Sequence, residues 1–147
     1  MNSPIVKVFA AVIVLVLLVP IIQAVWPKPA TFERARQAFV AAGMDVTGYR
    51  EVAPGLEAVA QVSMTIGSAT VDIYQYGDEG KIVQNLEYQK KDAGTAIVEA
   101  WGLADALGAA KPKEIPQRTA RKGMLMLITT GEDTALLGRI RDTFRDM

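Results

Sequence analysis

The 147-residue chain is long enough for one compact domain with a short appendage, and 50% hydrophobic beside 22% charged residues argues against a disordered chain. Its formal net charge is zero, so no overall positive field attracts nucleic acid, and we expect no nucleic-acid partner. It has no cysteine and no histidine, which excludes disulfides, thiolate chemistry, a lipid-modified cysteine and the most common general base.

The N-terminal segment has the length and composition of a membrane anchor. Val8 to Trp26 carries no charge and includes only two residues that are not plainly apolar, Pro20 and Gln23. As a helix rising about 1.5 Å per residue, this run would span about 28 Å, close to the ~30 Å core of a bilayer. We therefore expect residues 1–29 to form an anchor and short linker, the lipid bilayer to be a partner through Val8 to Trp26, and residues 30–147 to form a single compact domain.

A cleaved signal peptide is the alternative for this segment. Val8 to Val19 would be its hydrophobic region and Ala24 the last residue before cleavage. Ile22, however, is bulkier than the small residue that is usual two positions earlier.

The orientation of the anchor is open. Lys28, Arg34 and Arg36 follow the apolar run and only Lys7 precedes it, a count that favours a cytoplasmic domain. A short leader with one lysine is equally typical of an anchor whose N-terminus faces the cytoplasm. We expect a single-pass protein of the cell membrane with its domain outside the cytoplasm.

The domain begins with a predicted helix and strand. Thr31 is a suitable N-cap, apolar residues recur at helical spacing from Phe32 to Ala42, and Gly43 ends the helix. Met44 to Val52 is predicted to be a strand, and Pro54-Gly55 marks a turn.

A tight hairpin is the clearest local pattern. Apolar and polar residues alternate over 58–66 and 69–74, on either side of Gly67-Ser68. A two-residue turn there predicts apolar pairs on one face and polar pairs on the other: Met64 with Val71, Val62 with Ile73, Thr65 with Thr70, Ser63 with Asp72, and Gln61 with Tyr74. A slip of one residue would destroy this agreement.

A helix is predicted to follow the hairpin, with Asp78 as its cap and Glu79 at its start. Its buried side would hold Ile82, Val83 and Leu86, with Tyr88 as a further candidate. Thr95 to Ala109 is also predicted to be helical, although Ile97-Val98 and Trp101 could belong to a strand instead.

The C-terminal part is predicted to hold a connection, a strand and a helix. Lys111 to Lys122 contains two prolines and little apolar content, which indicates an exposed connection. Gly123 to Thr130 is a continuous apolar run, typical of a strand buried on both faces. Glu132 to Asp146 is predicted to be an amphipathic helix with Leu136, Leu137, Ile140 and Phe144 facing inward.

This order of elements predicts an α+β fold, in which an N-terminal transmembrane helix precedes a small, mostly antiparallel sheet with helices packed on one face. The run VSMTIGSATVDIYQYGD, from Val62 to Asp78, combines a glycine turn, an alternating strand ending in an aromatic residue, and a helix start. Lys122-Gly123-Met124-Leu125 through Leu127 is followed by Gly131-Glu132 and the terminal helix.

Together these runs resemble small extracytoplasmic α+β domains of unknown function in bacterial lipoproteins and secreted proteins. The resemblance implies a location more than an activity. The chain departs from the lipoprotein members because it lacks the lipobox cysteine.

No catalytic, cofactor-binding or metal-binding residues are predicted. The common nucleophile, zinc and phosphate-loop motifs are absent. Ser63 would need a lysine as its base, and Asp72, Asp78 and Glu79 have simpler roles as solvated or capping carboxylates. We therefore expect a protein that is not an enzyme and has no cofactor, with carboxylate or lysine catalysis as a minor alternative.

The predicted interaction surface combines a basic segment with two strand tyrosines. Its residues are Tyr74, Tyr76, Lys111, Lys113, Arg118, Arg121 and Lys122. The basic segment could contact anionic headgroups or an acidic partner, or it could be a solvated loop. Tyr74 is expected to point away from the apolar face of the hairpin.

The predicted function is that of a membrane-anchored, non-catalytic accessory or scaffold protein, which presents its domain to a protein partner at the membrane. The alternative is an extracytoplasmic domain that binds a small ligand or lipid.

Overall fold

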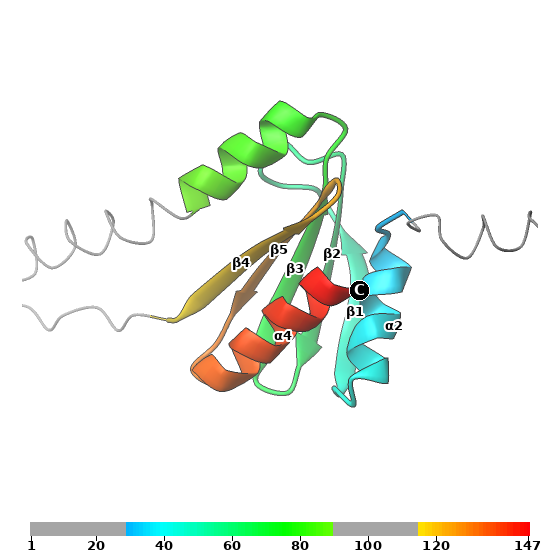
Figure 1. Ribbon diagram of the computed structural model, residues 1–147, viewed down its shortest axis with the longest axis vertical. Coiled ribbons are helices and arrows are strands. Elements are labelled where there is room, and N and C mark those ends of the chain that lie inside the picture. Colours follow the sequence, from blue (N-terminus) through cyan, green and yellow to red (C-terminus); the bar gives the residue numbers. More distant parts are fainter. Residues whose placement is uncertain (1–28, 90–114) are drawn as a thin grey trace, which may run out of the picture.

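Five strands form one antiparallel sheet (Figure 1). The computed structural model describes residues 29–89 and 115–147. The elements in chain order are α2 (Phe32–Ala41), β1 (Val46–Val52), β2 (Ala60–Ile66), β3 (Ala69–Gln75), a helix over residues 79–89, β4 (Gln117–Lys122), β5 (Leu125–Thr130) and α4 (Thr134–Asp146). The strand order is β1-β2-β3-β5-β4, with every neighbouring pair antiparallel. The α+β class and the antiparallel sheet are thus confirmed.

Part of the predicted organisation lies outside the described residues. This holds for the anchor over Val8 to Trp26, the helix over Thr95 to Ala109, and Lys111 and Lys113. Within residues 29–89 and 115–147, no helix is long and apolar enough to cross a bilayer. The anchor and its contact with the bilayer remain predictions.

The predicted hairpin is confirmed in its register. β2 and β3 pair Met64 with Val71 and Val62 with Ile73, and the three polar pairs also match. Gly67 takes a φ of +57°, in the left-handed region that favours glycine. Because the side-chain period of a strand is two, this register places the whole apolar set of both strands on one face.

Helix α2 ends in a capping motif that also explains where β1 begins. The backbone N–H of Gly43 donates to the Val40 carbonyl, and that of Met44 donates to the Phe39 carbonyl. This is a Schellman motif, with Gly43 at a φ of +74°. Met44 therefore packs back into the core as the residue after the cap, and the predicted strand over Met44 to Val52 starts only at Val46.

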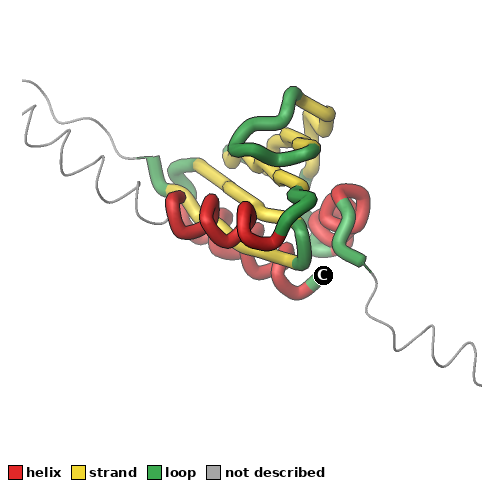
Figure 2. The backbone as a smooth tube through the Cα atoms, turned by 90° about the horizontal axis from the view of Figure 1, so that it is seen from above, coloured by secondary structure: helices red, strands yellow, loops and turns green. Residues whose placement is uncertain are grey.

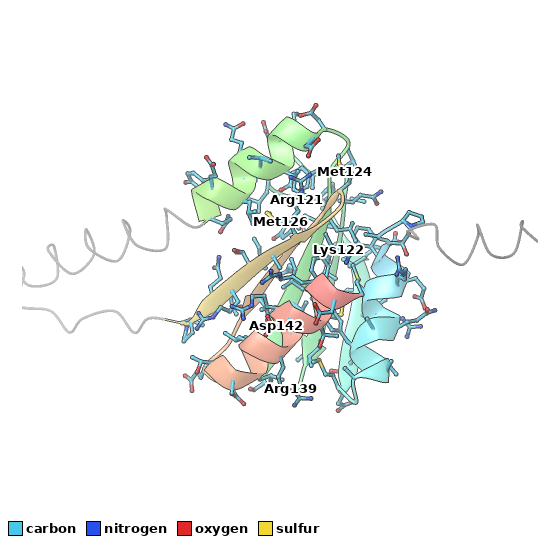
Figure 3. The ribbon with its side chains drawn as sticks, in the orientation of Figure 1. Arg121, Lys122, Met124, Met126, Arg139 and Asp142 are labelled. Carbon is cyan, nitrogen blue, oxygen red and sulfur yellow. The ribbon has the colours of Figure 1, made fainter. Side chains whose placement is uncertain are left out.

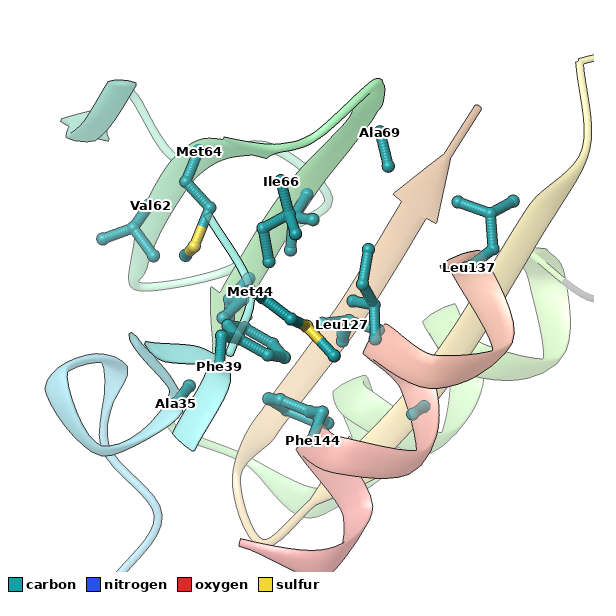
Figure 4. Packing of buried hydrophobic residues seen from close by; sticks show 14 of the residues in the cluster. Ala35, Phe39, Met44, Val62, Met64, Ile66, Ala69, Leu127, Leu137 and Phe144 are labelled. Carbon is teal, nitrogen blue, oxygen red and sulfur yellow. The ribbon is translucent and has the colours of Figure 1, made fainter. Parts of the chain in front are cut away.

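The larger core lies between the sheet and two helices, α2 and α4. Phe39 from α2 and Phe144 from α4 are both fully buried and meet over β2, β3 and β5 (Figure 4). We call this cluster the first core; its buried members are Ala35, Phe39, Met44, Val62, Met64, Ile66, Ala69, Val71, Ile73, Ala120, Leu125, Leu127, Leu137, Ile140 and Phe144. Each large side chain buried here stabilises the fold by about 1.5–3 kcal/mol. The predicted inward face of the last helix is confirmed for Leu137, Ile140 and Phe144, while Leu136 is half-buried.

The prediction that helices pack on one face is wrong. The 79–89 helix packs against the opposite face of the sheet, where a second core contains Tyr74, Tyr76, Ile82, Met126 and Ile128. Leu56, Ala58, Leu86 and Met124 are partly buried against it. The polar face of the hairpin is the kind of face that commonly borders solvent. However, β5 contributes apolar residues to both faces of the sheet, so each face needs a covering element. Figure 2 shows the strands of the sheet and the helices from above.

The burial predicted for β5 is confirmed, and the burial predicted for the 79–89 helix is confirmed only in part. β5 is buried on both faces as predicted, because Leu127 faces the first core and Met126 the second. In the 79–89 helix, Ile82 is buried and Leu86 half-buried, but Val83 and Tyr88 are 39% and 56% exposed. Ile82 and Leu86, about one turn apart, pack in the second core, whereas Val83 and Tyr88 face solvent.

The expected exposed connection over Lys111 to Lys122 is wrong for its last six residues. Gln117 to Lys122 forms β4, an edge strand that pairs along the whole length of β5. Ala120 is the single apolar residue of β4 and faces the first core. Since β4 is held by main-chain pairing with β5, its own side chains carry no alternating apolar pattern.

Candidate functional site

The predicted basic surface does not form one patch. Successive residues of β4 point to opposite faces, so Arg121 lies beside the 79–89 helix and Lys122 beside α4 (Figure 3). The Arg121 guanidinium donates to the Glu79 carboxylate at 2.7 Å. The Lys122 ammonium donates to the Arg145 carbonyl oxygen at 2.7 Å, where the negative end of the α4 dipole favours a cation. Arg118 is half-buried and donates to the carbonyl of the preceding residue.

These contacts give the described cations of β4 a structural role. Arg121 ties the start of the 79–89 helix to β4, and Lys122 caps the end of α4. Sequence patterning missed this division because a run of basic residues looks the same whether it forms a loop or a strand.

The two predicted surface tyrosines are buried, which corrects their assignment to an exposed interaction surface. Tyr74 is 9% exposed and Tyr76 is 2% exposed. Tyr74 does point away from the first core, as predicted, but it lies opposite Met126 in the sheet and under the second layer. Tyr76 follows β3 and donates its backbone N–H to the Met124 carbonyl at 2.9 Å.

The Tyr76 hydroxyl is a buried polar atom without a hydrogen-bond partner in the described part of the chain. Burial, with smaller effects from Tyr74 and Glu57, raises the pKa of Tyr76 to about 12. The phenol is therefore protonated at neutral pH and is a donor. An unsatisfied buried group of this kind costs about 1–3 kcal/mol, so it calls for a physical explanation.

The loop over residues 53–59 covers the second core in a strained conformation. Leu56 and Glu57 have φ values of +53° and +58°, in the left-handed region where a side chain costs about 1–2 kcal/mol per residue. The loop is held at both ends, because the Gly55 N–H donates to the Gln61 side-chain oxygen at 2.9 Å and the Val59 N–H donates to the Gln75 carbonyl at 2.8 Å. Such strain is found preferentially at functional sites.

No sequence signal identified this loop beyond the predicted turn at Pro54-Gly55. Leu56 and Glu57 have no preference for left-handed backbone, so only the tertiary structure places them there. Leu56 packs its side chain against the second core.

A second candidate region, the α2–β1 surface, lies on the outside of the domain. We define it by Glu33, Arg36, Gln37, Val40 and Tyr49. The Arg36 guanidinium forms two hydrogen bonds to the Glu33 carboxylate, at 2.8 and 3.0 Å, and its carbon lies 5.6 Å from the centre of the Tyr49 ring. These hydrogen bonds lower the pKa of Glu33, and the carboxylate raises the pKa of Arg36.

The α2–β1 surface is exposed yet ordered by its own contacts. Tyr49 is 38% exposed, Val40 is 54% exposed, and the Gln37 amide donates to Glu33 at 3.0 Å. Tyrosine and arginine are enriched among the residues that dominate binding energy in protein interfaces. Their presence on adjacent elements could not be predicted from the sequence, because α2 and β1 meet only after the turn at Gly43.

β1 itself is an open edge of the sheet. Within the described residues it pairs with β2 alone, and its five central residues, from Thr47 to Glu51, are all exposed. Gly48 and Tyr49 form a bulge opposite Met64, with Gly48 at a φ of +63°. A bulge and charged side chains limit uncontrolled pairing along an edge, so pairing here requires a partner of matching shape.

The predicted carboxylate candidates are held in separate structural roles. Asp72 accepts from the Gln61 amide at 3.3 Å, and Asp78 accepts from the Lys81 N–H at 3.0 Å as the predicted N-cap. Glu79 is paired with Arg121. Across the described ranges, no group of three or more acidic residues is placed to hold a metal ion.

Comparison with known proteins found no matching family model, no matching curated protein and no matching solved structure. The resemblance to extracytoplasmic lipoprotein domains stays a prediction.

Proposed function

We propose that this chain is a membrane-anchored, non-catalytic accessory protein that presents its α+β domain, outside the cytoplasm, to a protein partner at the membrane. The partner docks on the α2–β1 surface and adds an extended segment to the open edge of β1. The observation that supports this most directly is the ordered Arg36–Tyr49 pair beside a sheet edge that no described residue covers with a further strand.

Main-chain groups and side chains contribute differently to such docking. The outer edge of β1 offers backbone N–H and carbonyl groups, which give affinity to an extended segment whose shape accommodates the bulge. The Arg36–Tyr49 pair offers specificity, because Glu33 already holds the guanidinium in place and less side-chain entropy is lost on binding.

The position of this surface favours a partner at the membrane over a second copy of the chain. The predicted anchor ends only a few residues before α2 begins at Phe32, so the α2–β1 surface stays close to the bilayer. A pairing of β1 with its own copy would place a bulge in both strands of the ladder, which disturbs the pairing of each.

Site-specific photo-crosslinking in intact cells tests the proposal. A benzophenone amino acid replaces Tyr49 in the full-length chain, and a matched variant carries it at Thr70, an exposed residue of β3, two strands away from β1 in the sheet. We expect one stoichiometric adduct with a membrane protein from position 49 and none from position 70, with cross-linked peptides that map to an extended segment of that protein. Equal adducts at both positions, or adducts with a second copy only, would contradict the proposal.

A pair of proline substitutions tests whether the partner adds a strand. Adjacent residues of a strand direct their N–H groups to opposite sides, so one of Arg50 and Glu51 points its N–H at β2 and the other points outward. Arg50→Pro and Glu51→Pro should therefore differ, and one should destabilise the domain by breaking pairing with β2. The variant that keeps its thermal stability should lose the adduct from position 49; retention of the adduct in that variant would exclude strand addition.

A further inference from the structure

The second core holds a donor without an acceptor. The Tyr76 hydroxyl is buried and has no partner among the described residues, although buried polar groups are paired in most folds. Tyr74 lies in the same cluster but accepts no hydrogen bond from this hydroxyl, and the other surrounding side chains include the aliphatic and thioether groups of Ile82, Leu86, Met124 and Met126. A partner for the hydroxyl must therefore arrive within an apolar molecule.

Charge narrows the chemistry of that molecule. Glu57 lies close enough to act electrostatically on Tyr76, and an anionic ligand would be repelled by this carboxylate and would lose its hydration in the apolar cluster. A neutral carbonyl oxygen has neither disadvantage and accepts well from a phenol. An aliphatic chain bearing an ester group meets both conditions.

The loop over residues 53–59 supplies a way in. The Leu56 side chain packs against one side of the second core. The backbone φ of Leu56 lies in the left-handed region that a leucine rarely adopts, and the same holds for Glu57 beside it. Replacement of the Leu56 side chain by a ligand would release this strain while it keeps the core filled. The ends of the loop stay tied through Gly55 and Val59, so only its centre must move.

We propose that the second core is a binding site for a neutral acyl ester, in which the aliphatic chain displaces Leu56 and the ester carbonyl accepts a hydrogen bond from the Tyr76 hydroxyl. This site is separate from the α2–β1 surface, so the two proposals can fail independently.

Photolabelling of the full-length chain in phospholipid nanodiscs tests the site. The probes are the methyl ester of a diazirine-bearing decanoic acid and the corresponding free acid. We expect the ester to label residues 53–59 and 79–89, with the acid labelling them several-fold less. A further probe carries the diazirine on a phospholipid acyl chain of the disc. Label from it at the same residues identifies the bilayer as the ester source, and label from the methyl ester alone identifies a free lipid.

Three variants make the result decisive. Tyr76→Phe should lower ester labelling about five- to tenfold while thermal unfolding shows a fold at least as stable, because only an unpaired hydroxyl is removed. Leu56→Ala should raise labelling, since it removes the competing side chain. Tyr88→Phe, which removes an exposed phenol from the 79–89 helix, should leave ester labelling unchanged. Absence of ester label at these residues, equal labelling by the acid, or unchanged labelling of Tyr76→Phe would overturn the proposal.

Discussion

The two faces of one sheet are packed in different ways. The first core is built from apolar side chains that α2 and α4 cover, and it holds two fully buried phenylalanines. Among residues 29–89 and 115–147, the second core has five buried members, two of them tyrosines, beneath a helix and a strained loop. We therefore expect the first core to contribute more to stability, whereas the second contains a strained loop and an unpaired buried hydroxyl among the described residues.

The exposed part of the second face shows how limited its cover is. Thr47, Thr65, Thr70 and Thr130 are paired in one row across β1, β2, β3 and β5. The first three are exposed and the fourth is half-buried, so the 79–89 helix and its loop cover only the other end of this face. Threonine suits an exposed strand because its branched side chain packs well on a pleated surface.

The largest expected difference between the cores is in their response to truncation. Phe144→Ala should lower the free energy of unfolding by about 3–5 kcal/mol, because it leaves a cavity between α2, α4 and the sheet. Ile82→Ala should cost about 2–3 kcal/mol, since the 79–89 helix can shift to fill part of the space. Urea denaturation measures both. An equal loss in the two variants would mean that the two cores respond as a single unit.

A smaller effect depends on pH and isolates Tyr76. Its pKa is about 12 in the folded protein and about 10 in the unfolded chain, so the unfolded state loses its proton first as the pH rises. This difference in pKa leaves the free energy of unfolding unchanged below pH ~10. Between pH ~10 and ~12 it lowers the free energy of unfolding by up to about 3 kcal/mol. Tyr76→Phe should be the more stable protein by about 1 kcal/mol at pH 7, and its advantage over the wild type should grow above pH ~10.

Denaturation of the wild type and Tyr76→Phe in parallel at each pH removes the effects of the other titrating groups. A constant difference between the two proteins across this range would show that the Tyr76 hydroxyl reaches solvent when it ionises.

The smallest expected effect concerns the strained loop. Glu57→Gly should raise the free energy of unfolding by up to about 1 kcal/mol, because glycine adopts a φ near +58° without steric cost and the exposed glutamate side chain loses little. Glu87→Gly is the matched control within the 79–89 helix and should lower it by about 1 kcal/mol. Thermal unfolding of both compares them directly. A loss of stability in Glu57→Gly would show that contacts of the glutamate side chain stabilise the fold by more than the backbone strain costs.

Most of the first core could be predicted from the sequence, as could Ile82 and the β5 residues of the second core, but the burial of Tyr74 and Tyr76 could not. The alternation around Gly67 specified a hairpin register that the structure confirms, and the apolar run of β5 indicated burial on both faces. The same alternation placed Tyr74 on the face opposite the apolar one, as the structure confirms. A strand pattern shows which residues share a face, but it does not show whether another element covers that face.

The candidate site residues illustrate the same limit. Arg121 and Lys122 were placed in one basic segment, yet the strand period sends them to opposite layers, where each bonds to a different helix. Arg36 and Tyr49 carried no motif, and their contact arises because the Gly43 turn folds β1 back along α2.

By itself, the sequence determined what depends on neighbours in the chain: the caps at Thr31 and Asp78, the glycine turns, the hairpin register and the amphipathic last helix. Tertiary structure alone decided the second layer, the β4 edge, the left-handed backbone at Leu56 and Glu57, and the burial of Tyr76. The physical reason is range: caps and registers are set by hydrogen bonds and periods within one or two elements. Burial and strain are set by packing between elements that are distant in sequence, which no local pattern records.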